Sequence, residues 1–136
     1  MEERAVQSFE DVAVWWATRQ VVHTVYALSR EPGLARDLGL CGQVQRAAVS
    51  IMSHVAEGFE RLHMPEKLQF YNVARSSSAA VHSLLYVAED NYPSLAARSA
   101  ALRQEVIRVG TLLTGLIQPT QQPRPSQKTS YANPNS

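Results

Sequence analysis

Histidines close to glutamates are the first residues whose spacing in this sequence could support metal chemistry. Glu60 and His63 are three positions apart in the segment ERLH. Di-metal sites inside four-helix bundles need such a Glu-x-x-His pair on two helices and a further Glu on each of the other two. The sequence has no second pair, because His23 and His82 are preceded at that distance by glutamine and alanine. We therefore expect neither a metal centre nor a cofactor.

Catalysis without a metal is equally poorly supported by the residue pattern. His54 lies three positions before Glu57, but a histidine on a helix face is a more common interpretation than a general base. The sequence contains no Gly-rich phosphate loop, no nucleophile elbow and no Ser, His and Asp set that the chain order would bring together. We predict that the protein is not an enzyme and has no small-molecule substrate.

Basic and aromatic side chains in the middle of the sequence favour binding instead. Arginine contacts phosphate and an exposed tyrosine can stack on a base, so this combination is suited to RNA. The candidate residues for contacts with nucleic acid or a protein partner are Arg46, Arg61, Lys67, Arg75, His82 and Tyr86. Glu57, Glu60 and Glu66 lie among these cations, and a solvated surface of mixed charge is the competing interpretation.

Length and composition limit the protein to one compact domain. The 136 residues are 45% hydrophobic, and 13 Lys and Arg against 12 Asp and Glu leave a formal charge of +1. Such a charge produces no strong long-range attraction to nucleic acid or to anionic lipid. The single cysteine, Cys41, is expected to be a core residue and fits a reducing compartment. An acidic N-terminus and the absence of a long apolar run predict no signal peptide and no membrane span, hence a cytoplasmic protein.

Hydrophobic side chains recur every three or four positions along four successive segments, and no alternating strand pattern lies between them. Ser8 and Asp11 have the spacing of a capping box at the start of the first segment. Pro32 and Gly33 end that segment, and Pro65 suits the first position of the third. The predicted helices are Phe9–Arg30, Leu40–Leu62, Glu66–Asp90 and Ser94–Ile117. The stripes predicted to face the core include Ile51 and Leu62 in the second helix, Val81 in the third and Leu102 in the fourth.

Short connections usually make successive helices antiparallel. The sequence therefore predicts an all-α fold, an antiparallel up-down-up-down four-helix bundle, over residues 1–117. Residues 118–136 are rich in Pro, Gln, Ser, Thr and Asn and almost devoid of apolar side chains. Such a composition cannot offset the entropy of ordering, and we predict a disordered C-terminal tail.

The predicted helices are apolar over more of their circumference than a bundle of four requires. The second helix has a main stripe centred on Ile51 and an additional band formed by Val49, Met52, Ala56 and Phe59. A helix in an isolated bundle needs one apolar arc of about 100°. We expect another copy of the chain to cover the additional band, and the competing interpretation is a thick monomer core with scattered exposed apolar residues.

Two segments, SFEDVAVWWATRQVVHTVYALS and GLCGQVQRAAVSIMSHVAEGFER, resemble the ribosomal RNA intervening-sequence family, which is named for reading frames inserted in large-subunit rRNA genes. The family pattern begins F-x-D-L-x-V-W and continues R-A-A-x-S-I-x-x-x-[IV]-A-E-G, and the resemblance covers about residues 9–115. The matching residues are Phe9, Asp11, Val14, Trp15, Arg46, Ala47, Ala48, Ser50, Ile51, Ala56, Glu57 and Gly58. Met52 and His54 depart from the usual S-I-P-S-N-I-A-E-G, and the missing proline should leave the second helix straighter.

The resemblance implies a four-helix bundle, ring-shaped homo-oligomers that are often pentamers, and no known enzymatic activity. It also implies distant relatives among accessory proteins of diversity-generating retroelements, in which the bundle binds a reverse transcriptase and nucleic acid. Two hypotheses follow. The chain is either an oligomeric scaffold or adaptor for a protein partner, or an RNA- or DNA-binding accessory protein associated with the reverse transcriptase of a retroelement.

The AEG segment of this pattern also has a simple structural interpretation. Gly58 destabilises a helix interior by about 0.5–1 kcal/mol relative to alanine, so we expect close packing or a helix end there. Glu57 precedes Arg61 by four positions, the favourable orientation for a surface ion pair. Helix packing plus a solvated charge pair is therefore the alternative to a binding role for this segment.

Overall fold

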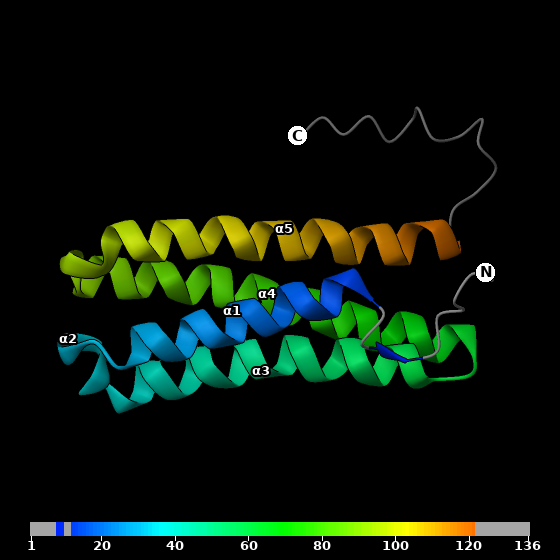
Figure 1. Cartoon of the computed structure of the whole chain (residues 1–136), viewed down its shortest axis with the longest axis horizontal. Helices are drawn as coiled ribbons and strands as arrows, with labels where there is room; N and C mark the ends of the chain where they lie inside the picture. Colours follow the sequence, from blue (N-terminus) through cyan, green and yellow to red (C-terminus); the bar gives the residue numbers. More distant parts are fainter. Residues whose placement is uncertain (1–7, 10–11, 122–136) are drawn as a thin grey trace, which may run out of the picture.

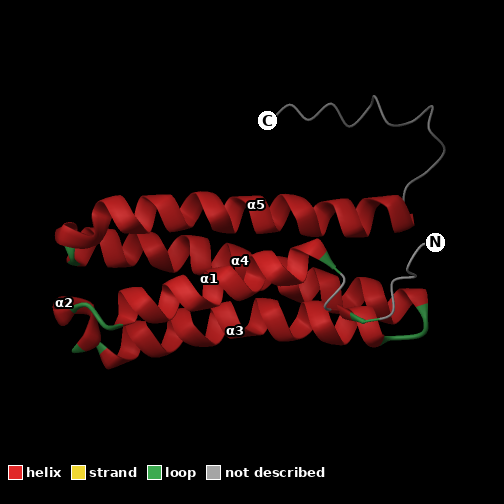
Figure 2. Cartoon of the chain, viewed as in Figure 1, coloured by secondary structure: helices red, strands yellow, loops and turns green. Residues whose placement is uncertain are grey.

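A computed structural model describes residues 8–9 and 12–121 of the chain, with side chains described as far as residue 118. This part of the chain is helical and contains no strand (Figure 2), which confirms the all-α prediction. The elements are α1 (Ala13–Ser29), α2 (Pro32–Ala35), α3 (Leu38–Glu60), α4 (Met64–Asn91), the 3-10 helix η2 (Pro93–Leu95) and α5 (Ala96–Gln121). The C-terminal tail was predicted to begin at residue 118, but α5 continues past that boundary to Gln121 because the helical backbone is not interrupted there. The rest of the predicted tail, residues 122–136, lies outside the described residues.

The four long helices lie side by side and alternate in direction (Figure 1). In cross-section, α3 packs on α4, α4 on α5, and α1 closes the bundle between α3 and α5. The short α2 lies at the end where α1 turns into α3. The predicted up-down-up-down bundle is therefore confirmed. It places α1 and α4 diagonally, so that their outer sides point in opposite directions.

The core contains one apolar stripe from each long helix. Val21, Ile51, Val81, Leu102 and Leu113 are each less than 2% exposed, and burying a side chain of this size contributes about 1.5–3 kcal/mol. These stripes are the ones that the hydrophobic spacing predicts.

One predicted core residue, Leu62, is 90% exposed. The backbone of Arg61 is extended, with φ −70° and ψ 144°, so α3 ends at Glu60 and Leu62 lies in the turn.

The start of the first helix also differs from the prediction. α1 begins at Ala13 rather than Phe9, and its N-cap, Val12, makes no side-chain capping hydrogen bond. The Val12 amide instead donates to the Phe9 carbonyl (3.0 Å), and the Phe9 ring packs on Trp15 with ring centroids 4.9 Å apart. This hydrogen bond and the ring contact therefore hold Phe9 against the first turn of α1. Asp11, the second residue of the expected capping box, lies outside the described residues.

A polar clamp joins the start of α3 to the turn between α4 and α5. Asp37 caps α3 by accepting from the Leu40 amide (3.0 Å), and it also accepts from the Tyr92 hydroxyl (2.8 Å). These two hydrogen bonds lower the pKa of the Asp37 carboxyl, with the Leu40 amide as the larger cause. The clamp fixes the end of the bundle at which α2 lies.

None of the described helices combines the length and apolar character that a membrane span requires.

Candidate functional site

The six predicted binding residues lie in three separate places. Arg75, His82 and Tyr86 are spaced seven and four positions apart on α4 and face its seam with α5, where Arg75 and His82 line the same hollow. Arg61 and Lys67 lie on either side of the turn between α3 and α4, and Arg46 is exposed on α3. The structure therefore brings together three of the six residues.

The cations at the α3–α4 turn are used to hold that turn. Lys67 Nζ donates to the Phe59 carbonyl oxygen (2.6 Å), an acceptor at the end of α3, and more weakly to the Gly58 carbonyl (3.4 Å), which also accepts from the Arg61 amide (3.3 Å). The Arg61 guanidinium lies over the Phe70 ring, 4.5 Å from its centroid. Both contacts stabilise the turn.

The prediction of an ion pair between Glu57 and Arg61 is wrong. Arg61 is the C-cap of α3 with an extended backbone, so its side chain no longer follows the helical spacing on which the expectation depended. Its guanidinium stacks on Phe70 of α4 instead.

Arg46 is isolated from the other candidates. Its side chain lies along its own helix, where a Cβ placed on Gly42 would be 3.0 Å from Arg46 Nη1. Arg46 does not line the α4–α5 seam hollow that Arg75 and His82 share.

The Glu60 and His63 pair does not form half of a metal site. Glu60 is the last residue of α3, whereas His63 is the N-cap of α4 with an extended backbone. The described residues contain no group of three or more His, Cys, Asp or Glu side chains placed to hold a metal ion.

A polar cluster occupies the α4–α5 seam near the η2 end. The Glu89 carboxylate accepts from Arg103 Nε (2.6 Å) and Nη2 (3.3 Å) and from Ser99 Oγ (2.7 Å). The Glu89 and Arg103 side chains are only 15% and 16% exposed. Hydrogen bonding from Arg103 is the main reason why the pKa of Glu89 lies below its ordinary value.

Tyr86 belongs to the same cluster. Arg103 Nη1 donates to the Tyr86 hydroxyl (3.0 Å), and the guanidinium carbon lies 4.2 Å from the centre of the ring. The His82 ring stacks on Tyr86 with centroids 5.6 Å apart. Tyr86 is 47% exposed, but its ring already has partners within the protein.

Towards the middle of α4 the seam opens into a hollow of about 320 Å³, which we call the α4–α5 hollow. Its lining residues are Arg75, Ser78, Ala79, His82, Val106, Ile107, Gly110, Thr111 and Thr114. Arg75 Nη1 donates to Thr114 Oγ1 over a long 3.4 Å, and no described carboxylate forms an ion pair with Arg75. A guanidinium beside hydroxyl groups can bind an anion.

Sequence reasoning missed Glu89, Arg103, Thr111 and Thr114 as contributors to this seam. The contacts of Glu89 with Arg103 and of Thr114 with Arg75 cross 14 and 39 positions of sequence, and Thr111 joins them only by lining the same hollow as Arg75. No local spacing signals such a pair, because the relative register of α4 and α5 decides which side chains meet.

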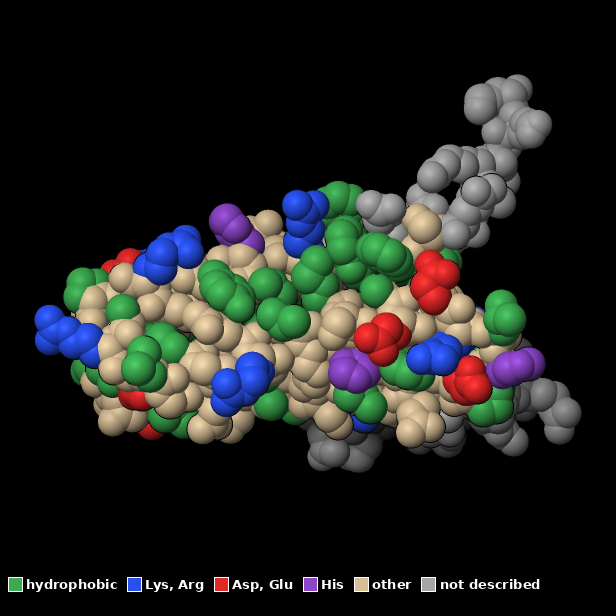
Figure 3. Space-filling model, turned by 90° about the horizontal axis from the view of Figure 1, so that it is seen from below, with side chains coloured by type: hydrophobic (Ala, Val, Ile, Leu, Met, Phe, Trp, Pro, Cys, Tyr) green, Lys and Arg blue, Asp and Glu red, His purple; other side chains and the backbone are tan. Residues whose placement is uncertain are grey.

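A different surface lies on the outer side of α1 and α3. Trp16, Tyr26 and Val49 are 49%, 40% and 41% exposed, and Val22, Met52 and Ala56 are half-buried. We call these six residues the α1–α3 face. Figure 3, which views the molecule from the α3 side, shows hydrophobic side chains gathered in the middle of this surface and acidic ones towards one end. Arg19 lies over the Trp16 ring, 5.2 Å from its centroid.

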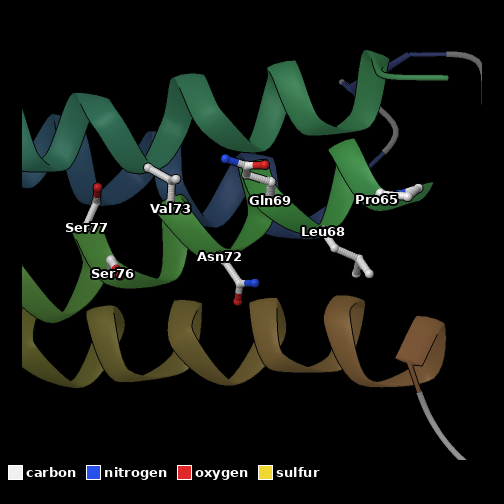
Figure 4. Close-up of a pocket in the computed structure, with 7 residues that line it drawn as sticks. All are labelled: Pro65, Leu68, Gln69, Asn72, Val73, Ser76 and Ser77. Carbon is white, nitrogen blue, oxygen red and sulfur yellow. The ribbon is translucent and has the colours of Figure 1, made fainter. Parts of the chain in front are cut away.

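The outer side of α4 carries a shallow hollow of about 660 Å³. It is lined by Pro65, Leu68, Gln69, Asn72, Val73, Ser76 and Ser77. Leu68 and Asn72 point towards α5, and Gln69 and Val73 point towards α3 (Figure 4). Because none of these side chains is charged, the surface is suited to packing against an uncharged protein face.

A comparison with protein-family models matches residues 10–115 to the model described as 23S rRNA-intervening sequence protein. The matched range contains α1 to α4 and most of α5. No curated protein matches the chain.

Proposed function

Given that the chain belongs to the 23S rRNA-intervening sequence protein family, we propose that it is a non-enzymatic scaffold that self-associates and holds a protein partner. The observation that carries this proposal is the exposed α1–α3 face. Its members include an indole, a phenol and several aliphatic side chains on neighbouring helices. Contiguous apolar surface of this kind marks interaction sites in soluble proteins.

A second copy of the chain is the partner that we propose for this face. A closed ring of more than two copies needs two different surfaces, because each copy contacts its neighbours head to tail. The uncharged outer side of α4 provides a second surface, and it points away from α1. We therefore propose a ring in which the α1–α3 face of one copy packs on α4 of the next, with the five members that the resemblance implies.

The experiment compares two substitutions of equally exposed apolar residues in the full chain. Val49 lies on the α1–α3 face at 41% exposure, and Ile107 lies in the α4–α5 seam at 42%. Light scattering should give the wild-type protein a mass several times the 15.1 kDa of one chain. Val49→Glu should shift the mass to smaller species, because it places a charge in the contact, whereas Ile107→Glu should keep the wild-type mass.

Circular dichroism of both variants establishes that they are folded. A wild-type protein of 15.1 kDa at micromolar concentration would contradict self-association. An unchanged mass for a folded Val49→Glu variant would show that copies meet elsewhere.

A second candidate function is nucleic-acid binding as an accessory protein, in association with a reverse transcriptase. The observation that favours it is Arg75, whose guanidinium has no carboxylate partner among the described residues. One such site per copy would be weak, but a ring would repeat it and raise the avidity. A gel shift with structured RNA at low and moderate salt tests this candidate, and no shift at either salt would exclude it.

We propose a cytoplasmic location for either function. The buried and unpaired Cys41 supports it, because secreted domains of this size more often carry disulfides.

A further inference from the structure

We infer that the α4–α5 hollow binds the backbone of a single RNA strand. In this arrangement Arg75 and Thr114 contact a phosphate, and Thr111 contacts a ribose 2′-hydroxyl. The inference rests on the second candidate function above, and it adds the ligand and the atoms that recognise it.

The charge around the hollow favours a phosphate. The described carboxylates of α4 and α5 belong to Glu66, Glu89, Asp90 and Glu105, and none of them lines the hollow. Glu89 is neutralised by Arg103. The positive charge of Arg75 therefore has no compensation within the hollow, and a phosphodiester would supply it.

The hydroxyl groups match the remaining atoms of an RNA backbone. Thr114 Oγ1 accepts from Arg75 (3.4 Å), and its own hydrogen has no acceptor among the described residues, so both groups can donate to the same phosphate. Thr111 Oγ1 already donates to the Ile107 carbonyl (3.2 Å), so its lone pairs remain to accept. A ribose 2′-hydroxyl can donate to that oxygen, and DNA has no equivalent group.

The shape of the seam favours a single strand over a duplex. The hollow is a shallow depression of about 320 Å³ between two helices, and Arg75 supplies the one guanidinium that lines it. A flexible strand can bend into it, whereas a duplex presents two rigid backbones to a surface that offers few cations. Tyr86 lies under Arg103, so we expect little base stacking and little sequence preference.

Fluorescence anisotropy on the full chain tests the inference with single-stranded RNA of about 12 nucleotides, the DNA of the same sequence and the duplex RNA. We expect the single RNA strand to bind most tightly. Arg75→Gln should weaken this binding about tenfold and reduce its dependence on salt. Arg108→Gln is the matched control, because Arg108 is an exposed arginine of α5 that does not line the hollow, and it should have a much smaller effect.

Thr111→Val tests the contact with the ribose. It removes the hydroxyl and keeps the shape of the side chain, so we expect about three- to tenfold weaker binding of RNA and unchanged binding of DNA. Circular dichroism and light scattering on each variant establish that the fold and the oligomeric state are unchanged.

The outcomes separate this inference from the function on which it rests. If the wild-type protein binds no nucleic acid, both this inference and the second candidate function are excluded. Binding that prefers duplex RNA, or that falls equally in Arg75→Gln and Arg108→Gln, would overturn the inference and leave nucleic-acid binding standing. If Thr111→Val weakens the binding of RNA and of DNA equally, the proposed contact with the 2′-hydroxyl is overturned.

Discussion

The helix α4 shares one seam with α3 and another with α5, and these two seams are built differently. At the α3 seam, a Cβ on Gly58 would lie 2.8 Å from Tyr71 Cε1 and 3.0 Å from Phe70 Cβ. Ser50 and Ser77 also join their hydroxyl groups across this seam at 2.8 Å. The α3–α4 seam is therefore closed by direct packing.

At the α5 seam, a Cβ on Gly110 would meet only Ser78 Oγ, at the ordinary distance of 3.7 Å. The seam is held at one end by the Arg103 and Glu89 pair and opens beside it into the α4–α5 hollow. The closed seam therefore uses its small residues for the fold, whereas the open seam leaves polar groups available to a ligand.

Substitution of the glycine in the closed seam should have the largest effect. Gly58→Ala places a methyl group against a buried aromatic ring and a backbone-proximal carbon that cannot easily move. We expect the free energy of unfolding to fall by about 1–3 kcal/mol, as measured by chemical denaturation. An unchanged free energy of unfolding would show that the α3–α4 seam accommodates an added methyl group as easily as the α4–α5 seam.

A glycine-to-alanine substitution in the open seam should change the free energy of unfolding in the opposite direction. Gly110 lies in the interior of α5, and a methyl group there meets no close neighbour. Alanine is the better helix former, so Gly110→Ala should raise the free energy of unfolding by about 0.5–1 kcal/mol. A loss of stability would mean that the α4–α5 seam is as tightly packed as the α3–α4 seam.

Removal of the ion pair in the open seam should have the smallest effect on stability, and this effect should depend on pH. The folded pKa of Glu89 lies below its ordinary value because Arg103 binds the ionised form. Its stabilising contribution is therefore present above the unfolded pKa, near 4.5, and is lost as the pH falls through the lower folded pKa. Glu89→Gln should lower the melting temperature by a few degrees at neutral pH and by nothing in strong acid.

Glu105→Gln, at an exposed position of the neighbouring helix, is the control for that measurement. Its melting temperature should follow wild type at both pH values. If the melting temperatures of wild type and Glu89→Gln still differ in strong acid, the effect comes from packing rather than from the charge.

The sequence was sufficient for the elements and their core faces. Ile51, Val81 and Leu102 were predicted from their spacing to face the core, and each is buried. The prediction failed at Leu62, which continues the periodic stripe in sequence but follows the end of α3. Periodicity cannot detect where a helix stops when the apolar pattern continues into the turn.

The candidate site was only partly predictable. All six candidates were predicted to bind a partner or nucleic acid, and the structure places only Arg75, His82 and Tyr86 along one seam. Lys67 was expected at a binding surface, but it caps the end of α3. The competition between an internal carbonyl and an external phosphate for the same ammonium group depends on the path of the turn, which the sequence does not specify.

Four amphipathic helices, their alternating direction and the family could be derived from the residues alone, because they depend on positions three and four apart, on short connections and on local motifs. The folded bundle was needed to show which seam of α4 is closed, that Glu89 neutralises Arg103, and that Arg75 is left without a carboxylate partner among the described residues. These features depend on the lateral register of neighbouring helices. That register is fixed by the packing of the whole core at once.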